Sequence, residues 1–344
     1  MASLVIWCGD SGTMTVRNGS DGQRIERAST RGRRKYIPHL AEFYFRPTHD
    51  WTLEEAQALF DATRNMIGPY ALDRVYYMDC IQGMSSLPAE SIDLVIADPP
   101  FGIDFDGKSS MYNRDSGLVV SGYGEVTEEY ERFALRWLTH VTRVLSPSGS
   151  AYVFSGWTNL EAILTAARVS GLHLLNHIIW HYPFGVFTRR KFVTSHYHIL
   201  LLVKDSQKYM FNKIENYPQD VWVLRRPYRP GRLKNGTKLP LELVQKCIDY
   251  SSRPGDVVLD PFMGNGTTAV AARGSWRHFI GFEINRDLQP IMEAEIAGVE
   301  LGQFYVPYRD RLPTIRELAK KYPRAFKEYL RREGLTAEEV LQDG

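Results

Sequence analysis

Residues 257–268, VVLDPFMGNGTT, decide the fold class of this 344-residue chain. The apolar run Val257 to Leu259 is typical of a buried strand, and a helical pattern begins at Thr267. Between them, Gly264 and Gly266 let the backbone turn sharply and approach a ligand closely. The stretch therefore predicts a strand, a tight turn and a helix. In an open α/β sheet, ligands bind at such a carboxyl end of a strand.

A second strand end of the same kind occurs much earlier in the chain. The run Ile92 to Ala97 predicts a buried strand, and Asp98-Pro99-Pro100-Phe101 follows it directly. From residue 73 onwards such strands alternate with helical patterns, which is typical of a parallel sheet covered by helices on both faces. The runs 174–180 and 198–203 are connected too closely for an ordinary crossover helix, so we expect an antiparallel pair near the sheet edge.

The two ends of the chain carry helical patterns without recognisable chemistry. Thr52 to Met66 predicts a helix, because Thr52 can cap it and Glu54 and Glu55 favour its first turn. Thr314 to Glu333 predicts a charged helical region that is broken near Pro323.

Composition excludes several classes of protein. A hydrophobic content of 44% is normal for a chain with a full core. No apolar run approaches the roughly 18 residues that a membrane span needs, and the N-terminus lacks the basic start of a secretory signal. The three cysteines are not clustered, so we expect neither a metal site nor a disulfide framework. A cytoplasmic location is the corresponding expectation.

Positive charge is concentrated locally, although the net charge is only +2. The stretch 221–241 contains no acidic residue, and 31–35 and 189–191 are smaller basic clusters. Such stripes are typical of a protein that binds a polyanion at one face, although a solvated loop has the same composition. The candidate contacts are Arg189, Arg190, Lys191, Arg225, Arg226, Arg229, Arg232 and Lys234.

Two acidic residues at strand ends indicate what the glycine turn binds. Asp260 ends the first strand, and Glu283 ends the run His278 to Phe282. Glu283 suits the two hydroxyls of a ribose, as in dinucleotide folds, but Ala269 occupies the third glycine position of the dinucleotide pattern. Asp260 fits a cation better than a pyrophosphate. S-adenosylmethionine, with its amino group, sulfonium and ribose, therefore fits better than NAD.

The segment after Ala97 has the chemistry to hold an exocyclic amine of a nucleobase. The lone pair of such an amine is delocalised into the ring, so catalysis must orient the nitrogen with two hydrogen-bond acceptors. The Asp98 carboxylate and the Pro99 carbonyl can supply them, and Pro100 stiffens the turn. Phe101 can stack on a base that has left the duplex. A D-P-P turn alone is common, and the cofactor segment is what makes this interpretation specific.

With both segments in place, the chain resembles the S-adenosylmethionine-dependent DNA amino-methyltransferases of the permuted β group. In that family the D/S-P-P-Y/F motif precedes D-P-F-x-G-x-G-T, as here. Residues 77–80 are similar to the family's G-D-C segment, residues 238–243 to its T-Q-K-P-x-x-L segment, and residues 253–256 to the turn before the cofactor strand. The resemblance spans roughly residues 73–290.

The resemblance implies a Rossmann-like, mostly parallel sheet of seven strands with the antiparallel pair at its edge. It implies base flipping and a loop over DNA, 102–124, with Asn113 and Arg114 as DNA contacts. Asp79 is then an acceptor for the cofactor's adenine amine, although an ordinary strand-terminal Asp would look the same. The implied cofactor residues are Asp79, Cys80, Lys238, Asp260, Pro261, Phe262, Gly264, Asn265, Gly266, Thr267, Thr268, Glu283, Ile284 and Asn285.

The resemblance also gives an expected domain organisation. Residues 1–72 are an unassigned extension and 73–204 the catalytic half. A short basic target-recognition segment, 205–238, precedes the cofactor half, 239–300, and the helical extension is 301–344.

Asp98 favours adenine N6 as the acceptor, because the family tends to show Ser-Pro-Pro for cytosine N4. Cytosine N4 stays open as the alternative, and RNA is a less favoured substrate. Cytosine C5 methylation needs a thiolate, usually on a cysteine that follows proline. The residues before the three cysteines are Trp7, Asp79 and Lys246, so the sequence excludes this reaction. We expect duplex DNA as partner and no membrane. A homodimer and a separately encoded restriction endonuclease are further candidate partners.

Overall fold

The computed structural model describes residues 5–8, 14–17, 47–100, 129–183, 188–215, 217–225, 238–311 and 315–341. The chain forms two compact units. The larger unit comprises residues 44–312, and the smaller one combines residues 1–43 with 313–344. The site residues predicted from the sequence all belong to the larger unit.

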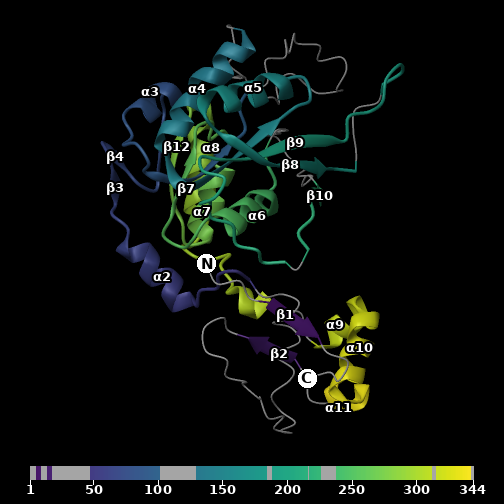
Figure 1. Ribbon diagram of the computed structural model, residues 1–344. Helices are drawn as coiled ribbons and strands as arrows, with labels where there is room; N and C mark the ends of the chain where they lie inside the picture. Colours follow the sequence, from purple (N-terminus) through teal and green to yellow (C-terminus); the bar gives the residue numbers. More distant parts are fainter. Residues whose placement is uncertain are drawn as a thin grey trace. The chain divides into compact units, whose positions relative to one another are not determined.

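A central sheet organises the larger unit, and its described part has eight strands in the order β10-β8-β9-β7-β6-β11-β12-β5 (Figure 1). All neighbours from β5 to β7 are parallel, and only β9 runs against its neighbours. The strands are β5 (Arg74–Tyr76), β6 (Ile92–Ala97), β7 (Leu145–Ser155), β8 (His173–His181), β9 (His196–Val203), β10 (Val221–Val223), β11 (Val257–Asp260) and β12 (His278–Phe282).

The mostly parallel sheet and the antiparallel β8–β9 pair confirm the predicted fold class. The strand count differs from the expected seven. The three residues of β10 pair parallel with β8 and extend the sheet beyond the antiparallel pair. Their sequence, Val-Trp-Val, is too short for a periodic pattern to emerge. Strand β7 begins at Leu145, which pairs with Ile92 across an irregular register.

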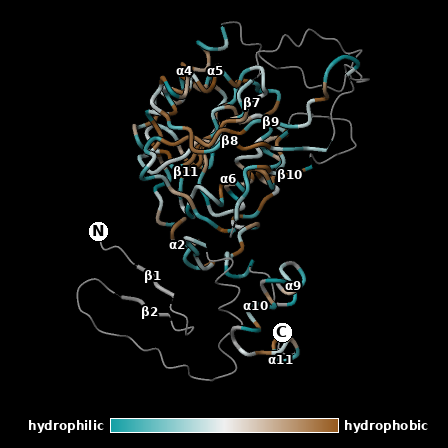
Figure 2. Tube along the Cα trace, turned by 45° about the vertical axis from the view of Figure 1, so that its right-hand side comes forward, coloured by the Kyte–Doolittle hydropathy of each residue, from teal (hydrophilic) through white to brown (hydrophobic). Residues whose placement is uncertain are grey.

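Helices cover both faces of the sheet, and alternate strand residues point to opposite layers. On β6, Val95 packs with the buried faces of α3, α4 and α5, whereas Leu94 packs with α6, α7 and α8. Figure 2 shows the resulting hydrophobic strands between more polar outer helices. The helices are α3 (Cys80–Ser85), α4 (Tyr130–Val144), α5 (Leu160–Ser170), α6 (Leu241–Ser251), α7 (Thr267–Gly274) and α8 (Gln289–Ala297).

Helix α2 (Leu53–Ala62) begins as the sequence predicts. The Thr52 hydroxyl accepts from the Glu55 backbone N–H and the Glu55 carboxylate accepts from that of Thr52, which makes a capping box. The helix ends four residues before the predicted Met66. There the Thr63 hydroxyl donates to the Gly255 carbonyl at 2.9 Å, a tertiary contact that periodicity cannot reveal. The short elements of this unit are β3 (Met66–Ile67), β4 (Tyr70–Ala71), η3 (Arg286–Leu288) and η4 (Tyr308–Arg311).

In the smaller unit, β1 (Val5–Cys8) and β2 (Met14–Arg17) form an antiparallel pair. The C-terminal part has α9 (Ile315–Lys321), α10 (Pro323–Glu333) and α11 (Ala337–Leu341). Pro323 opens α10, which confirms the predicted break. None of the described helices is both long and apolar enough to cross a membrane.

Candidate active site

The two segments with the predicted chemistry leave the sheet side by side. Strands β6 and β11 are adjacent and parallel, with Leu94 opposite Val258 and Val95 opposite Leu259. Asp98 follows the end of β6, and Asp260 is the last residue of β11. Both carboxylates therefore lie at the carboxyl edge of the sheet, where β12 also ends. Chain topology brings together residues that are far apart in the sequence.

The Asp260 carboxylate is buried and fixed from two sides. Oδ2 accepts from the Thr268 hydroxyl at 2.6 Å, and Oδ1 accepts from the Phe262 backbone N–H at 2.9 Å. Burial raises the pKa of Asp260 to about 7, the two hydrogen bonds oppose the shift, and the Asp98 and Glu283 carboxylates add to it. A bound cation would relieve the cost of this buried negative charge.

Glu283 ties the glycine turn to the end of β12. Its Oε2 accepts from the Gly264 backbone N–H at 2.7 Å, and its Oε1 accepts from that of Asn285 at 2.8 Å. The Asn285 side chain in turn accepts from the Asp287 N–H and caps η3. These bonds hold two neighbouring loops in one arrangement. Ile284, between them, is 63% exposed.

The glycine turn has the conformation that its sequence predicts. Gly264 has φ +53° and Gly266 has φ +76°, both in the left-handed region that disfavours side chains. A Cβ at Gly266 would also lie 2.6 Å from Cγ of Met292. Gly266 leads directly into α7, whose first backbone N–H groups have no partners within the helix.

An aromatic row joins the cofactor segment to α4. Phe262 meets Trp137 edge-to-face at 5.3 Å between ring centroids and lies 6.0 Å from Phe133, which lies 5.8 Å from Tyr130. Burial raises the pKa of the Tyr130 hydroxyl, Asn159 opposes the shift, and the Asp98 carboxylate adds to it. Tyr130 therefore belongs to the surroundings of Asp98. Sequence reasoning missed it, because nothing in the pattern of α4 marks its first residue as close to the end of β6.

Three predicted cofactor residues already have structural roles. The Asp79 carboxylate caps α3 by accepting from the backbone N–H groups of Ile81 and Gln82. The Cys80 side chain is buried in the core, where burial raises the pKa of its thiol to about 12. Lys238 pairs with Glu295 of α8 at 2.8 Å.

The segment after Lys238 lies beside the glycine turn. The Thr267 hydroxyl donates to the Leu239 carbonyl at 3.4 Å, a long hydrogen bond. The resemblance of residues 238–243 to a cofactor-side element is therefore compatible with their position. Pro261 and Asn265 lie in the same turn.

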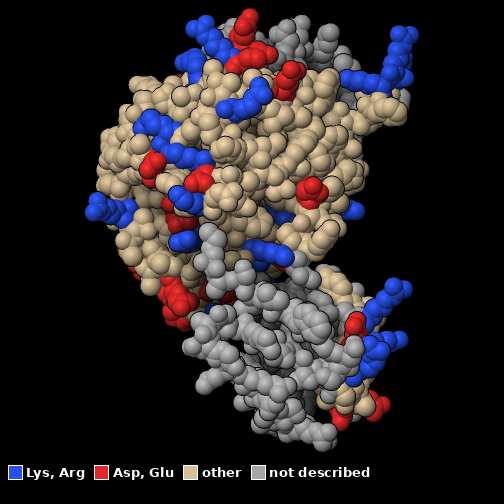
Figure 3. All heavy atoms as spheres, viewed as in Figure 1, with Lys and Arg blue, Asp and Glu red and all other residues tan. Residues whose placement is uncertain are grey.

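Basic residues lie at the same edge of the sheet. Strands β8 and β10 run parallel to β7, so Arg189, Arg190 and Lys191 follow one strand at its carboxyl end and Arg225 follows the other. All four side chains are exposed. Figure 3 shows Lys and Arg side chains at the end of the projection that Figure 1 draws in teal beyond β8 and β9. The predicted site residues outside the described ranges are Phe101, Asn113, Arg114, Arg226, Arg229, Arg232 and Lys234.

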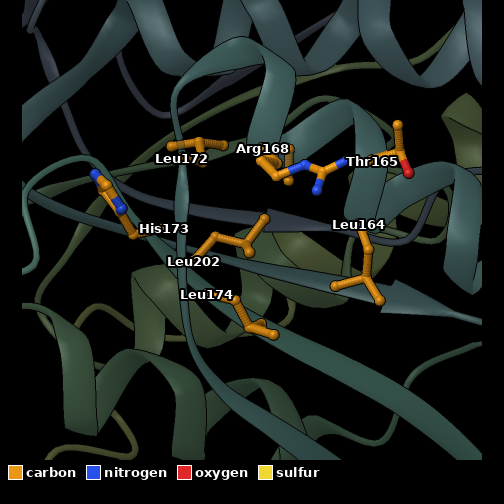
Figure 4. Close-up of a pocket in the computed structure, with 8 residues that line it drawn as sticks. Leu164, Thr165, Arg168, Leu172, His173, Leu174 and Leu202 are labelled. Atoms are coloured by element: carbon orange, nitrogen blue, oxygen red, sulfur yellow. The ribbon is translucent and has the colours of Figure 1, made fainter.

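A surface pocket of about 430 Å³ lies at the opposite edge of the sheet, between α5 and the start of β8 (Figure 4). It is lined by Leu164, Thr165, Ala167, Arg168, Leu172, His173, Leu174 and Leu202. This lining contains no carboxylate and none of the predicted site residues. Among the described residues, no group of three or more His, Cys, Asp or Glu could hold a metal ion.

Comparison with known proteins gives a consistent result. A family model described as DNA methylase, of the N6/N4 type, matches residues 92–294. The type II methyltransferase M.HinfI of Haemophilus influenzae is 30% identical over 249 residues, which cover 67% of this chain and 69% of that protein. The DNA adenine methyltransferase YhdJ of Escherichia coli K12 is 30% identical over 245 residues, covering 62% and 79%.

Two solved structures share the fold. The M1.HpyAVI–SAM complex is 24% identical with a TM-score of 0.50, and the match covers 65% of this chain and 98% of that one. The cytosine-N4-specific PvuII DNA methyltransferase is 18% identical with a TM-score of 0.50, covering 67% and 95%.

Proposed function

This chain belongs to the N6/N4 DNA methylase family, and we propose that it transfers the methyl group of S-adenosylmethionine to N6 of adenine in duplex DNA after base flipping. The observation that carries the proposal is the placement of Asp98 and Asp260 at the carboxyl ends of two adjacent parallel strands. One carboxylate can hold the amine while the other faces the cation.

The cofactor fits the turn between β11 and α7. Its positive charge suits the buried Asp260, and its ribose hydroxyls suit Glu283, which already positions the turn through Gly264. Bound there, S-adenosylmethionine supplies an electrophilic methyl group. The residues proposed to hold it are Asp79, Cys80, Lys238, Asp260, Pro261, Phe262, Gly264, Asn265, Gly266, Thr267, Thr268, Glu283, Ile284 and Asn285.

The chain's task at the other strand end is to orient the target amine. The Asp98 carboxylate and the Pro99 carbonyl accept its two N–H bonds, so that the nitrogen lone pair points at the methyl group. Loss of a proton follows readily once the methylated nitrogen carries positive charge, so Asp98 need not be a strong base. Pro100 stiffens the turn, and Phe101 is proposed to stack on the extruded base.

Cofactor affinity is expected to fall as the pH drops below about 7, by up to roughly tenfold per pH unit, because the pKa of Asp260 is about 7 and a cation binds its charged form. The same shift affects stability in a defined direction. The folded-state pKa of Asp260 exceeds the ordinary 3.8, so the folded chain binds this proton more tightly than the unfolded chain does. The resulting contribution to the free energy of unfolding is present at low pH and is lost as pH rises from 3.8 to about 7.

Titration calorimetry of the parent and of Asp260→Asn at pH 5.5, 6.5 and 7.5 checks this prediction. The amide does not ionise in this range, so the pH dependence should flatten in the variant. An equally steep dependence in both proteins would assign it to another group.

Exposed arginines at the carboxyl edge are proposed to contact DNA phosphates. Arg225→Ala is expected to weaken DNA binding and to reduce the slope of log affinity against log salt by about one, since one phosphate contact is lost. Arg74→Ala is the matched control, because Arg74 is exposed at the start of β5, on the opposite edge. Binding titrations at several salt concentrations measure both. Equal slopes for parent and Arg225→Ala would remove Arg225 from the interface.

Methylated DNA digested to nucleosides tests the proposed reaction. N6-methyladenine is the expected product, and Asp98 favours it over N4-methylcytosine. Recovery of N4-methylcytosine would replace adenine by the alternative acceptor, and methylation of RNA in preference to DNA would overturn the substrate class.

The finer organisation is also proposed from the resemblance. Residues 73–204 are the catalytic half, 205–238 the target-recognition segment and 239–300 the cofactor half, between the extensions 1–72 and 301–344. A homodimer and a separately encoded restriction endonuclease are proposed partners, in keeping with the type II name of the M.HinfI relative.

A further inference from the structure

The described part of the arm between β8 and β9, residues 188–195, presents a phenylalanine to solvent. Phe192 is 99% exposed and follows Arg189, Arg190 and Lys191 directly. A phenylalanine that stays exposed does not gain the free energy that burial of its ring would contribute. The next residue, Val193, is 40% exposed, so the two side chains form one exposed apolar surface, which has the character of a contact that is buried only in a complex.

The arm has an ordered base. His181 pairs with His196, and the Tyr182 backbone N–H donates to the Ser195 carbonyl at 2.9 Å, so the strands stay paired to the start of the projection. Tyr197 stacks on Trp180 with ring centroids 5.7 Å apart. The Thr188 hydroxyl donates to the Lys191 carbonyl and closes a turn. Residues 188–195, which carry the ring, are therefore anchored at Ser195 and closed by a turn at Thr188.

Topology places the base of the arm at the same edge of the sheet as the proposed catalytic residue. Strand β8 is parallel to β6, so the arm leaves the sheet at the edge where Asp98 lies. Only β7 separates β9 from β6, and two strand spacings amount to roughly 10 Å. The arm therefore starts close to the place where an extruded base would meet Asp98.

The surrounding charge identifies the partner. The sequence has no acidic residue between Pro183 and Lys204, whereas three cations precede Phe192. This combination of phosphate-binding cations and one apolar ring matches proteins that grip the DNA backbone and insert an apolar side chain between base steps.

We propose that Phe192 enters the duplex beside the target base and fills the space that the extruded base leaves, with Arg189, Arg190 and Lys191 holding the flanking phosphates. The inference rests on the proposed DNA methylation and adds to it the residue that stabilises the flipped state. Phe192 is thus a positioning residue, distinct from the groups that touch the reacting nitrogen.

Methyl transfer to two duplexes tests the inference, both carrying the methylation site found by sequencing DNA that the parent has modified. One duplex is fully paired, and in the other the target base faces an abasic position. Phe192→Ala should be roughly 10- to 100-fold slower than the parent on the paired duplex, because unstacking is no longer compensated. On the abasic duplex, extrusion of the target base costs little free energy, so the methyl-transfer rate of Phe192→Ala should be within about threefold of the parent's rate.

Two control variants distinguish the wedge from general DNA binding. Arg190→Ala should weaken binding to both duplexes alike, because phosphate contacts do not depend on pairing. Val169→Ala removes another exposed apolar side chain, at the end of α5 on the opposite edge, and should behave as the parent does.

The inference is overturned if Phe192→Ala matches the parent on paired DNA or is impaired equally on both duplexes. A change in oligomeric state on sedimentation, with equal impairment, would assign the arm to a contact between two copies of the chain. If the parent modifies no DNA, no site is found and the proposed function fails together with the inference, whereas an active parent with an unimpaired variant removes the wedge alone.

Discussion

Asp98→Ala is expected to lower the rate of methyl transfer by roughly a thousandfold or more, because the amine loses its charged acceptor in the transition state. Asp98 follows the buried end of β6, and its charge acts on the Tyr130 hydroxyl and on the Asp260 carboxylate. No carboxylate of the cofactor turn can replace it, since Asp260 and Glu283 accept from their own loops.

Cofactor binding separates this effect from misfolding. In Asp98→Ala the affinity for S-adenosylmethionine should change by less than about tenfold, as expected for removing a neighbouring charge rather than a binding group. Single-turnover transfer of a labelled methyl group and calorimetric titration give the two quantities. Asp98→Asn keeps the shape of the side chain and should be impaired less than Asp98→Ala. Retained turnover in Asp98→Ala would falsify the assigned role.

Asp260→Ala is expected to lower cofactor affinity by roughly a hundredfold or more, since it removes a buried charge and leaves two donors without their acceptor. These donors are the Thr268 hydroxyl and the Phe262 backbone N–H. The turn that Asp260 organises would then lose both its shape and its negative potential.

Asp260→Asn separates the effect of the lost charge from the effect of the lost hydrogen-bond acceptor, because the amide keeps one oxygen acceptor but carries no charge. Its affinity should lie between those of the parent and Asp260→Ala at pH 7.5. Thermal unfolding shows whether each variant is folded. Parental affinity in both folded variants would mean that the cation binds elsewhere.

The sequence predicted the elements of the site well, because the spacing of apolar residues along the chain indicates which of them are buried. Apolar runs of three and six residues marked β11 and β6, and the glycines marked the turn that φ values of +53° and +76° confirm. Pro323 marked the break between α9 and α10. Each signal comes from residues that are neighbours in the chain.

Features that depend on distant residues were not predictable in the same way. The closeness of Tyr130 to Asp98 arises because α4 packs over β6. Asp79 was predicted as a ligand acceptor, and the structure gives its carboxylate a capping role in α3 that any strand-terminal Asp could have. Strand β10 exists because β8 offers a free edge to three residues. Periodicity indicates which residues are buried, but it does not indicate which distant residues they contact.

A crystal structure of the chain with S-adenosylmethionine bound tests the central claim most directly. We expect the cofactor in the turn between β11 and α7, with its cationic end toward Asp260 and its methyl group directed to the side on which Asp98 lies. A cofactor bound away from that turn, or one whose methyl group points away from Asp98, would contradict the account.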